Sequence, residues 1–201
     1  DGSATSCPET VLRSVAKPLN SAAWRDQSDR PSRRNAVDDR AASPPMTAAT
    51  APGAFALLSE FLREDGHYLA SSGAYGDGGG EALACALELF LARPEIGFVW
   101  LASAEVDASH ATVGACVVCY AISTSRGTLV AQVDDVTIGR GWQGRGVGSA
   151  MLAALGDALR ARGITRIDTA CHRDNAGAWR FYERLGFRPL DEERIALLLD
   201  R

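Results

Sequence analysis

Features that are scarce in this sequence exclude several classes of protein. The 201 residues contain only three histidines, His67, His110 and His172, and these show no metal-ligand spacing. No run approaches the roughly 20 apolar residues that a membrane-spanning helix needs, and the first residues lack the apolar core of a secretion signal. We therefore expect a soluble, cytoplasmic protein with no membrane segment and no metal.

An excess of basic charge is also missing. Lysine and arginine total 21 and aspartate and glutamate total 25, so the formal net charge is −4. A general nucleic-acid binder normally carries a basic face that displaces counterions from phosphates. This composition favours small molecules or peptides as partners, cationic ones in particular, and argues against nucleic acid.

Cysteine is too sparse for a disulfide-rich secreted scaffold, because the chain has five scattered cysteines, an odd number. Cys116 and Cys119 form a single C-x-x-C within the apolar run Val113 to Ile122. A strand would point these two thiols to opposite faces, which favours core packing over a metal or redox pair. A reducing compartment fits this pattern.

The composition changes near residue 51. Residues 1–51 are rich in Ala, Ser, Arg, Asp and Pro and show little apolar periodicity. We predict a flexible extension over 1–51 and one folded domain over 52–201. Two alternatives stay open: Met46 could begin the folded unit, and Glu9 to Lys17 could form an edge strand.

Apolar spacing over the remaining chain predicts an α+β fold. Helical spacing occurs over 52–66, 81–93, 149–162 and 175–185. Strand-like runs that predict an antiparallel meander occupy 98–103, 112–122 and 128–138, and a further strand at 164–171 would be parallel to its predecessor. A closing hairpin is expected from 187–190 and 194–199. The expected architecture is a mixed, mostly antiparallel sheet with helices on both faces.

A glycine-rich segment between the strand at 128–138 and the helix at 149–162 indicates phosphate binding. The first N–H groups of a helix are unpaired and carry the positive end of the helix dipole. Alternate glycines let a ligand approach the backbone closely. The segment consists of Gln143, Gly144, Arg145, Gly146, Val147, Gly148 and Ser149. It matches neither a P-loop nor G-x-G-x-x-G, and a simple flexible connection is the alternative.

A second pattern lies in the helix at 175–185. Asn175, Ala178 and Tyr182 fall at i, i+3 and i+7 and so share one stripe of the helix. A thin chain could lie along this stripe, and the phenol of Tyr182 could donate a proton to a leaving group. The alternative is that Tyr182 only packs on the sheet.

Two adjacent acids interrupt the apolar strand at 128–138. Asp134 and Asp135 would be costly there unless they were solvated or paired. Their side chains must point in opposite directions unless a bulge intervenes. One of them could serve as a general base, or both could simply be solvated at a strand edge.

The two patterns resemble the signatures of the GNAT superfamily of N-acetyltransferases. Gln143, Gly146 and Gly148 match Gln/Arg-x-x-Gly-x-Gly/Ala, and the segment from Asn175 to Phe187 is similar to Asn-x-x-Ala-x-x-hydrophobic-Tyr-x-x-x-Gly-Phe. The resemblance covers roughly 52–199. It implies a GNAT-type sheet with a splayed parallel strand pair, and transfer of an acetyl group from acetyl-CoA to a primary amine by direct attack in a ternary complex.

The resemblance also implies roles for individual residues. Residues 143–149 would hold the pyrophosphate of coenzyme A. Val136, Thr137 and Ile138 would pair with the pantetheine arm, Asn175 would contact it, and an amide near Ile138 would meet the oxyanion.

The resemblance further implies that Tyr182 would be the general acid. Asp135 occupies a position where many members carry the base, whereas the earlier acidic position holds Gln132. Asp134 and water therefore remain alternatives to Asp135 as the base.

The acceptor is left open. In such folds the acceptor pocket lies between the first two helices and the closing hairpin, and the candidate residues here are Glu64, Asp65, His67, Tyr68, Tyr75 and Asp77. A noncatalytic acyl-CoA sensor and an enzyme using an alcohol or a longer acyl donor are the competing functions. A homodimer is compatible with the resemblance.

Overall fold

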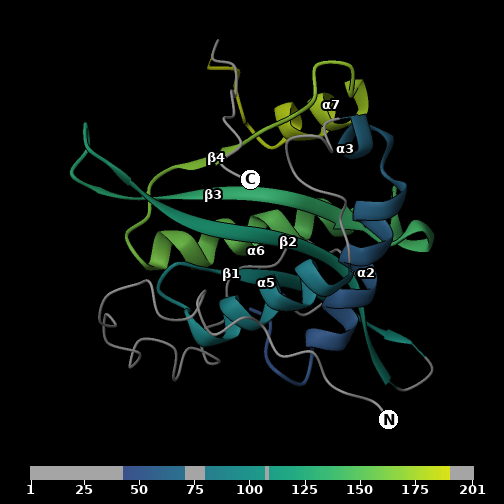
Figure 1. Ribbon diagram of the computed structural model, residues 1–201. Helices are drawn as coiled ribbons and strands as arrows, with labels where there is room; N and C mark the ends of the chain where they lie inside the picture. Colours follow the sequence, from purple (N-terminus) through teal and green to yellow (C-terminus); the bar gives the residue numbers. More distant parts are fainter. Residues whose placement is uncertain (1–42, 71–79, 107–108, 191–201) are drawn as a thin grey trace, which may run out of the picture.

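A mixed four-stranded sheet forms the centre of the molecule, with helices on both faces (Figure 1). The computed structural model describes residues 43–70, 80–106 and 109–190. The strands follow one another in the order β1-β2-β3-β4 across the sheet. Their bounds are Gly97–Val106 for β1, Ser109–Ser123 for β2, Thr128–Ile138 for β3 and Ile167–Thr169 for β4.

The strand directions are those that the sequence predicts. β1, β2 and β3 form an antiparallel meander, and β4 pairs in parallel with β3 after a crossover through a helix. The mixed, mostly antiparallel sheet is thereby confirmed. β4 is only three residues long, shorter than the predicted run at 164–171, because its ladder with β3 extends only from Ala131↔Ile167 to Val133↔Thr169.

Two helices cover one face of the sheet. They are α2 (Ala51–Glu64) and α5 (Gly80–Ala92), and the short α3 (Gly66–Ala70) follows α2. Pro52 lies in the first turn of α2, where its missing N–H costs nothing. Leu58 of α2 and Leu87 of α5 pack with Val99 and Leu101 of β1, so the apolar stripes of both helices are buried against the sheet.

The opposite face is covered by α6 (Val147–Ala161). The short α7 (Ala176–Arg184) packs Phe181 and Tyr182 against the same core. Met151, Leu155 and Leu159 of α6 are buried with Val118 and Val133 of the sheet. A short 3-10 helix, η2 (Arg140–Trp142), links β3 to the glycine-rich segment before α6. No helix in the described segments is long and apolar enough to cross a bilayer.

The thiols of the C-x-x-C are separated as the sequence predicts. Cys116 is fully buried within the core on the α6 face, whereas Cys119 is only partly buried. Both are free thiols. Burial raises the pKa of the Cys116 thiol to about 12, so this residue is an inert part of the core.

The chain contacts the sheet before the predicted boundary at residue 52. The amide of Leu101 donates to the carbonyl oxygen of Pro44 at 3.0 Å, and the amide of Met46 donates to that of Val99 at 2.7 Å. Pro45 bridges to Trp100 in an antiparallel sense, and the Met46 side chain is 8% exposed. Residues 1–42, including the alternative strand from Glu9 to Lys17, lie outside the described residues.

The closing hairpin is not seen as predicted. Residues 187–190 have no strand assignment. The second arm of this hairpin, at 194–199, lies outside the described residues.

Candidate active site

The edge of β3 beyond β4 provides the frame of the candidate site. The parallel ladder ends at Val133 and Thr169, and β3 then continues to Ile138. Among the described strands, Thr137 and Ile138 pair only with β2. The two parallel strands are thus joined at one end and separate at the other, which leaves a strand edge that an extended ligand can approach.

A β-bulge lies at the point where the strands separate. Ala115 pairs with Thr137 and Val117 with Asp134, so Asp135 and Val136 together oppose the single residue Cys116. Asp135 has a φ of 50°, the one positive value recorded for a described residue other than glycine. Aspartate tolerates this left-handed backbone better than most residues, and bulges often lie next to active sites.

The bulge changes which side chains share a face. Val133 is buried in the core beneath α6, and Val136 and Ile138 pack against the same core. Strict alternation would have placed Val136 on the opposite face from Val133. The extra residue therefore lets β3 present Thr137 toward α2, where it lines a pocket, while its apolar neighbours stay in the core.

The glycine-rich segment has the backbone needed to hold an anion. Gly144 and Gly146 have φ values of 71° and 83°, and an added Cβ at either would meet no atom within 4 Å. Gly146 is the N-cap of α6 and supplies no side-chain cap. The first amides of this 15-residue helix thus have no capping side chain, and the positive end of its dipole points at the open segment.

Gly148 has a different role within the same segment. A Cβ at this position would lie 3.3 Å from the Phe181 ring and 3.4 Å from Ile138 Cγ1. The first turn of α6 is therefore packed directly against α7 and the end of β3. This close packing holds the glycine-rich segment next to the open edge of β3.

Tyr182 of α7 lies in the core near the end of β4. It is 9% exposed, and its ring makes edge contacts with Phe181 and Phe187 at centroid distances of 5.2 and 5.3 Å. Burial raises the pKa of the Tyr182 phenol to about 12, although a hydrogen bond with Thr169 opposes part of that rise. The phenol is thus protonated at neutral pH and is a hydrogen-bond donor.

The sequence stripe predicts that Asn175 lies within the helix, but in the structure Asn175 is the N-cap residue that precedes α7. Its side-chain oxygen accepts a hydrogen bond from the Ala178 amide at 2.9 Å, which caps the helix. This use occupies the oxygen of the amide group. The cap does not use the two N–H groups of the Asn175 amide.

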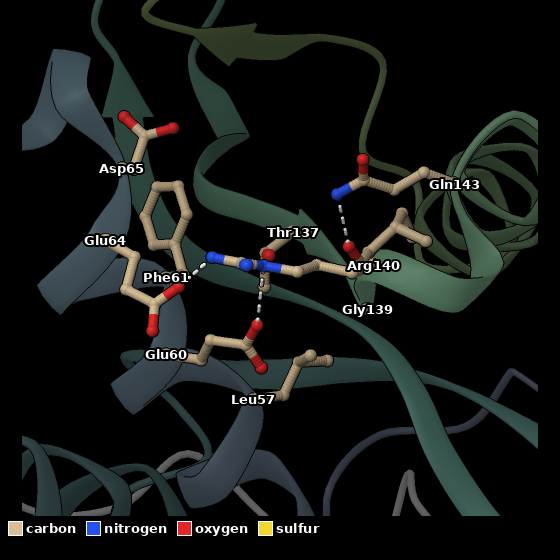
Figure 2. A pocket seen from close by; sticks show the side chains of 10 residues that line it. Leu57, Glu60, Phe61, Glu64, Asp65, Thr137, Gly139, Arg140 and Gln143 are labelled. Atoms are coloured by element: carbon tan, nitrogen blue, oxygen red, sulfur yellow. Dashed lines mark hydrogen bonds and ion pairs between the residues drawn. The ribbon is translucent and has the colours of Figure 1, made fainter.

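A pocket lies between α2 and the end of β3 (Figure 2). Three carboxylates from α2 and the residue that follows it line one side, and the other side is formed by the end of β3 and the start of the glycine-rich segment. The lining residues are Leu57, Glu60, Phe61, Glu64, Asp65, Thr137, Ile138, Gly139, Arg140 and Gln143. The Gln143 amide nitrogen donates to the Ile138 carbonyl at 2.9 Å and fixes that corner.

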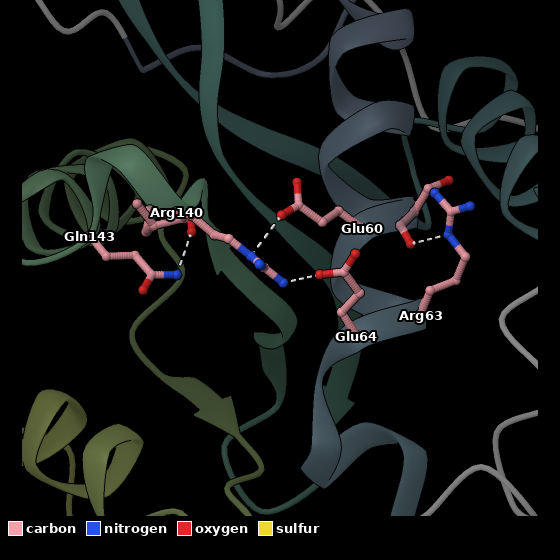
Figure 3. Close-up of polar contacts among 7 residues, drawn as sticks. Glu60, Arg63, Glu64, Arg140 and Gln143 are labelled. Atoms are coloured by element: carbon pink, nitrogen blue, oxygen red, sulfur yellow. Dashed lines mark hydrogen bonds and ion pairs between the residues drawn. The ribbon is translucent and has the colours of Figure 1, made fainter.

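Arg140 reaches across this pocket to α2 (Figures 2 and 3). Its Nε lies 3.1 Å from Glu60 Oε1, and its Nη2 donates to Glu64 Oε2. The side chains are exposed, at 74% for Arg140, 44% for Glu60 and 51% for Glu64. The pairs therefore lie at the solvent-facing rim of the site.

The predicted acceptor residues are divided by the structure. Glu64 and Asp65 line the pocket. Asp65 Oδ1 in addition accepts hydrogen bonds from the backbone amides of His67 and Tyr68 at the start of α3. The His67 ring lies 5.3 Å from that of His172 in the loop before α7. Tyr75 and Asp77 lie outside the described residues.

Sequence reasoning missed two contributors. Thr169 contacts the Tyr182 phenol from the last residue of β4, and no motif marks it. Glu60 joins Glu64 in the pocket, and their i, i+4 spacing on a helix was a usable signal for a shared face. No group of three His, Cys, Asp or Glu side chains that could hold a metal occurs in the described part of the chain.

Comparisons with known proteins agree with this geometry. The model of the acetyltransferase (GNAT) family matches residues 78–187. A Trypanosoma brucei acetyltransferase shares 18% identity, with a TM-score of 0.57 over 79% of this chain and 99% of that one. Glucosamine-6-phosphate N-acetyltransferase from Arabidopsis thaliana shares 13%, with a TM-score of 0.59 over 81% and 100%.

A further solved structure is informative because of what it contains. AAC(6')-Iy, in complex with the bisubstrate analogue CoA-S-monomethyl-acetylneamine, shares 15% identity, with a TM-score of 0.60 over 81% of this chain and 99% of that one. A search of curated proteins gave no significant match. The family model spans more than half of the 201 residues and includes both the glycine-rich segment and Tyr182. The chain belongs to the GNAT acetyltransferase family.

Proposed function

We propose that this protein is an N-acetyltransferase that moves an acetyl group from acetyl-CoA to a primary amine of a small molecule or peptide. One observation carries the proposal: the open edge of β3 runs from the bulge at Asp135 to the phosphate-binding segment, with Tyr182 near the point where β4 diverges. A candidate phosphate site, an open strand edge and a hydrogen-bond donor are thus all placed along the end of β3.

The residues fit the proposed cosubstrate. The open space above Gly144 and Gly146 and the uncapped first turn of α6 suit a pyrophosphate. The edge of β3 at Val136, Thr137 and Ile138 suits the amides of a pantetheine arm. When bound, acetyl-CoA would supply the acetyl group as an activated thioester.

Chain residues would then assist attack by the amine. A backbone amide of the strand end near Ile138 would stabilise the negative charge that develops on the thioester oxygen. Tyr182 would donate a hydrogen bond to the departing sulfur. The amine would form the C–N bond first, the C–S bond would then break, and coenzyme A would leave as a thiolate.

The amine must also lose a proton, and Asp135 is our proposed base. At the bulge, Asp135 does not follow the regular alternation of side chains between the two faces of the sheet. Asp134 is the competing carboxylate, because its charge contributes to the raised pKa of Tyr182 and it therefore lies near the proton donor. Transfer through water is the third route.

The carboxylates of the pocket support a cationic acceptor. The pocket lining contains three carboxylates and one arginine, namely Glu60, Glu64, Asp65 and Arg140. Such a surface attracts an ammonium ion and discourages an anionic acceptor.

Two glycine variants with matched backbones test cofactor binding. Gly146 and Gly127 both have positive φ, 83° and 63°, and both have open space at the Cβ position, but Gly127 lies in the β2–β3 turn. We expect Gly146→Trp to weaken acetyl-CoA binding in calorimetry by at least about tenfold. Gly127→Trp should bind as the wild type does, since it carries the same strain elsewhere.

A thiol-release assay over a panel of amines completes the test. Thiol release on any amine, lost in Gly146→Trp and kept in Gly127→Trp, would support the transferase. If the protein bound acetyl-CoA but released no thiol with any amine or alcohol acceptor, or with a longer acyl donor, a noncatalytic acyl-CoA sensor would be favoured. Absence of binding to the wild-type protein would overturn the proposal.

A further inference from the structure

Arg140 connects the two halves of the proposed site. It belongs to η2, which lies between the end of β3 and the glycine-rich segment. Its side chain nevertheless points away from that segment and ends on Glu60 and Glu64 of α2 (Figure 3). A cation next to the phosphate-binding segment is therefore held by two carboxylates that face the acceptor pocket.

The neighbouring arginines do not share this position. Arg63 leaves α2 on the side away from the pocket, where its Nε donates to the Ser59 carbonyl at 3.0 Å (Figure 3). Arg145 lies over the Trp142 ring, 5.4 Å from its centroid. Arg140 is thus the arginine that lines the pocket among the described residues.

The contacts of Arg140 are of a kind that a phosphate can replace. Arg140 and both glutamates are largely exposed, and exposed ion pairs stabilise a protein only weakly. A phosphate carries more charge than a carboxylate and accepts two parallel hydrogen bonds from a guanidinium. The free energy of binding can therefore draw Arg140 away from α2.

We propose that Arg140 exchanges partners when coenzyme A binds: its side chain releases Glu60 and Glu64 and binds a phosphate of the cofactor instead. The inference rests on the proposed function. It has two consequences: in the free protein the two glutamates compete with the cofactor for Arg140 and lower its affinity, and in the complex they face the pocket without that cation. A positively charged acceptor then binds better after the cofactor than before it.

A double-mutant cycle with coenzyme A as the probe tests the exchange. Calorimetry at one low ionic strength compares the wild type, Arg140→Gln, the pair Glu60→Gln with Glu64→Gln, and the triple variant. The double variant Glu60→Gln with Glu64→Gln should bind coenzyme A about 3- to 10-fold more tightly, because no ion pair of Arg140 has to break before it binds the phosphate. Arg140→Gln should weaken binding, and the glutamate substitutions should then have no effect.

A control separates a contact from net charge. Glu81→Gln with Glu88→Gln makes the same change in charge on the exposed face of α5. We expect no tightening from this pair. The exchange would be overturned if the control pair bound coenzyme A equally more tightly, or if the tightening persisted in the Arg140→Gln background. An unchanged affinity for coenzyme A in the Glu60→Gln with Glu64→Gln variant would also overturn it. If the wild type binds no coenzyme A, the proposed function itself fails, which is a different result.

Discussion

At the residue scale, burial makes the Tyr182 phenol harder to ionise. Its phenol has a pKa of about 12 because the ring is enclosed by the core, and Thr169 offsets only part of this effect. A thiol ordinarily has a pKa near 8.5, so this phenol is the weaker acid. Tyr182 is therefore suited to hydrogen-bond a departing sulfur throughout the reaction without ionising.

Replacing Tyr182 by phenylalanine should remove this hydrogen bond and keep the packing. We expect Tyr182→Phe to lower kcat in the thiol-release assay by about 10²-fold or more, because a hydrogen bond that stabilises the departing sulfur in the transition state is lost. The loss of stability should be only about 1 kcal/mol, from the hydrogen bond to Thr169. A variant with full activity would remove Tyr182 from the mechanism.

The same substitution should change how stability depends on pH. The folded pKa of Tyr182, about 12, is raised above its ordinary value of 10, so the native state holds the proton more tightly than the unfolded chain. Stability from this residue is complete below pH 10 and falls as pH rises toward 12, by about 2 to 3 kcal/mol in all. Urea unfolding at pH 8, 10 and 11 should show a shallower loss for Tyr182→Phe.

Asp135 combines a left-handed backbone with a candidate catalytic carboxylate, and three substitutions separate these properties. Asp135→Gly should keep stability within about 1 kcal/mol of the wild type because glycine adopts a φ of 50° freely. Asp135→Asn should behave similarly, whereas Asp135→Val should lose about 1 to 3 kcal/mol. Urea unfolding measures these differences.

Activity of the same three variants addresses the base. If the carboxylate is required, Asp135→Gly and Asp135→Asn should both lose kcat/KM by about 10²-fold while remaining folded. Normal activity in Asp135→Gly would show that the bulge matters only through its backbone. Asp134→Asn is the matched comparison, because it alters the neighbouring acid on a residue with an ordinary φ.

At the element scale, α7 depends on its cap. Asn175→Ala should cost about 1 kcal/mol because the Ala178 amide loses its acceptor. Asn175→Asp should keep the cap and the stability, since aspartate caps as well as asparagine. If the Asn175 nitrogen binds the cosubstrate, Asn175→Asp should still weaken acetyl-CoA binding in calorimetry, and an unchanged Kd would limit Asn175 to capping.

At the scale of the whole molecule, the residues before α2 complete the sheet. Pro44 and Met46 make two backbone hydrogen bonds to β1, and Met46 is buried beside α2. A chain starting at residue 47 should therefore be less stable than one starting at residue 43, by about 2 to 5 kcal/mol. Urea midpoints of the two chains measure the difference, and equal midpoints would show that this segment only rests on β1.

Most helices and strands could be predicted because their signals are local. The apolar spacing of α6, the strand runs of the meander and the glycines that follow α6 and α7 each lie within a few residues of what they specify. The arm at 187–190 was predicted as a strand and has no strand assignment, and strand formation is hard to predict locally because it depends on pairing with another segment.

The sequence by itself determined most of the elements, the glycine-rich segment before α6 and the position of Tyr182 on its helix, because periodicity and glycine placement act over one or two turns of chain. Only the tertiary structure decided the bulge at Asp135, since it depends on the register between β2 and β3. It likewise decided the contact of Arg140 with Glu64, 76 residues apart in sequence. Such contacts arise when distant elements pack, and no local pattern records them.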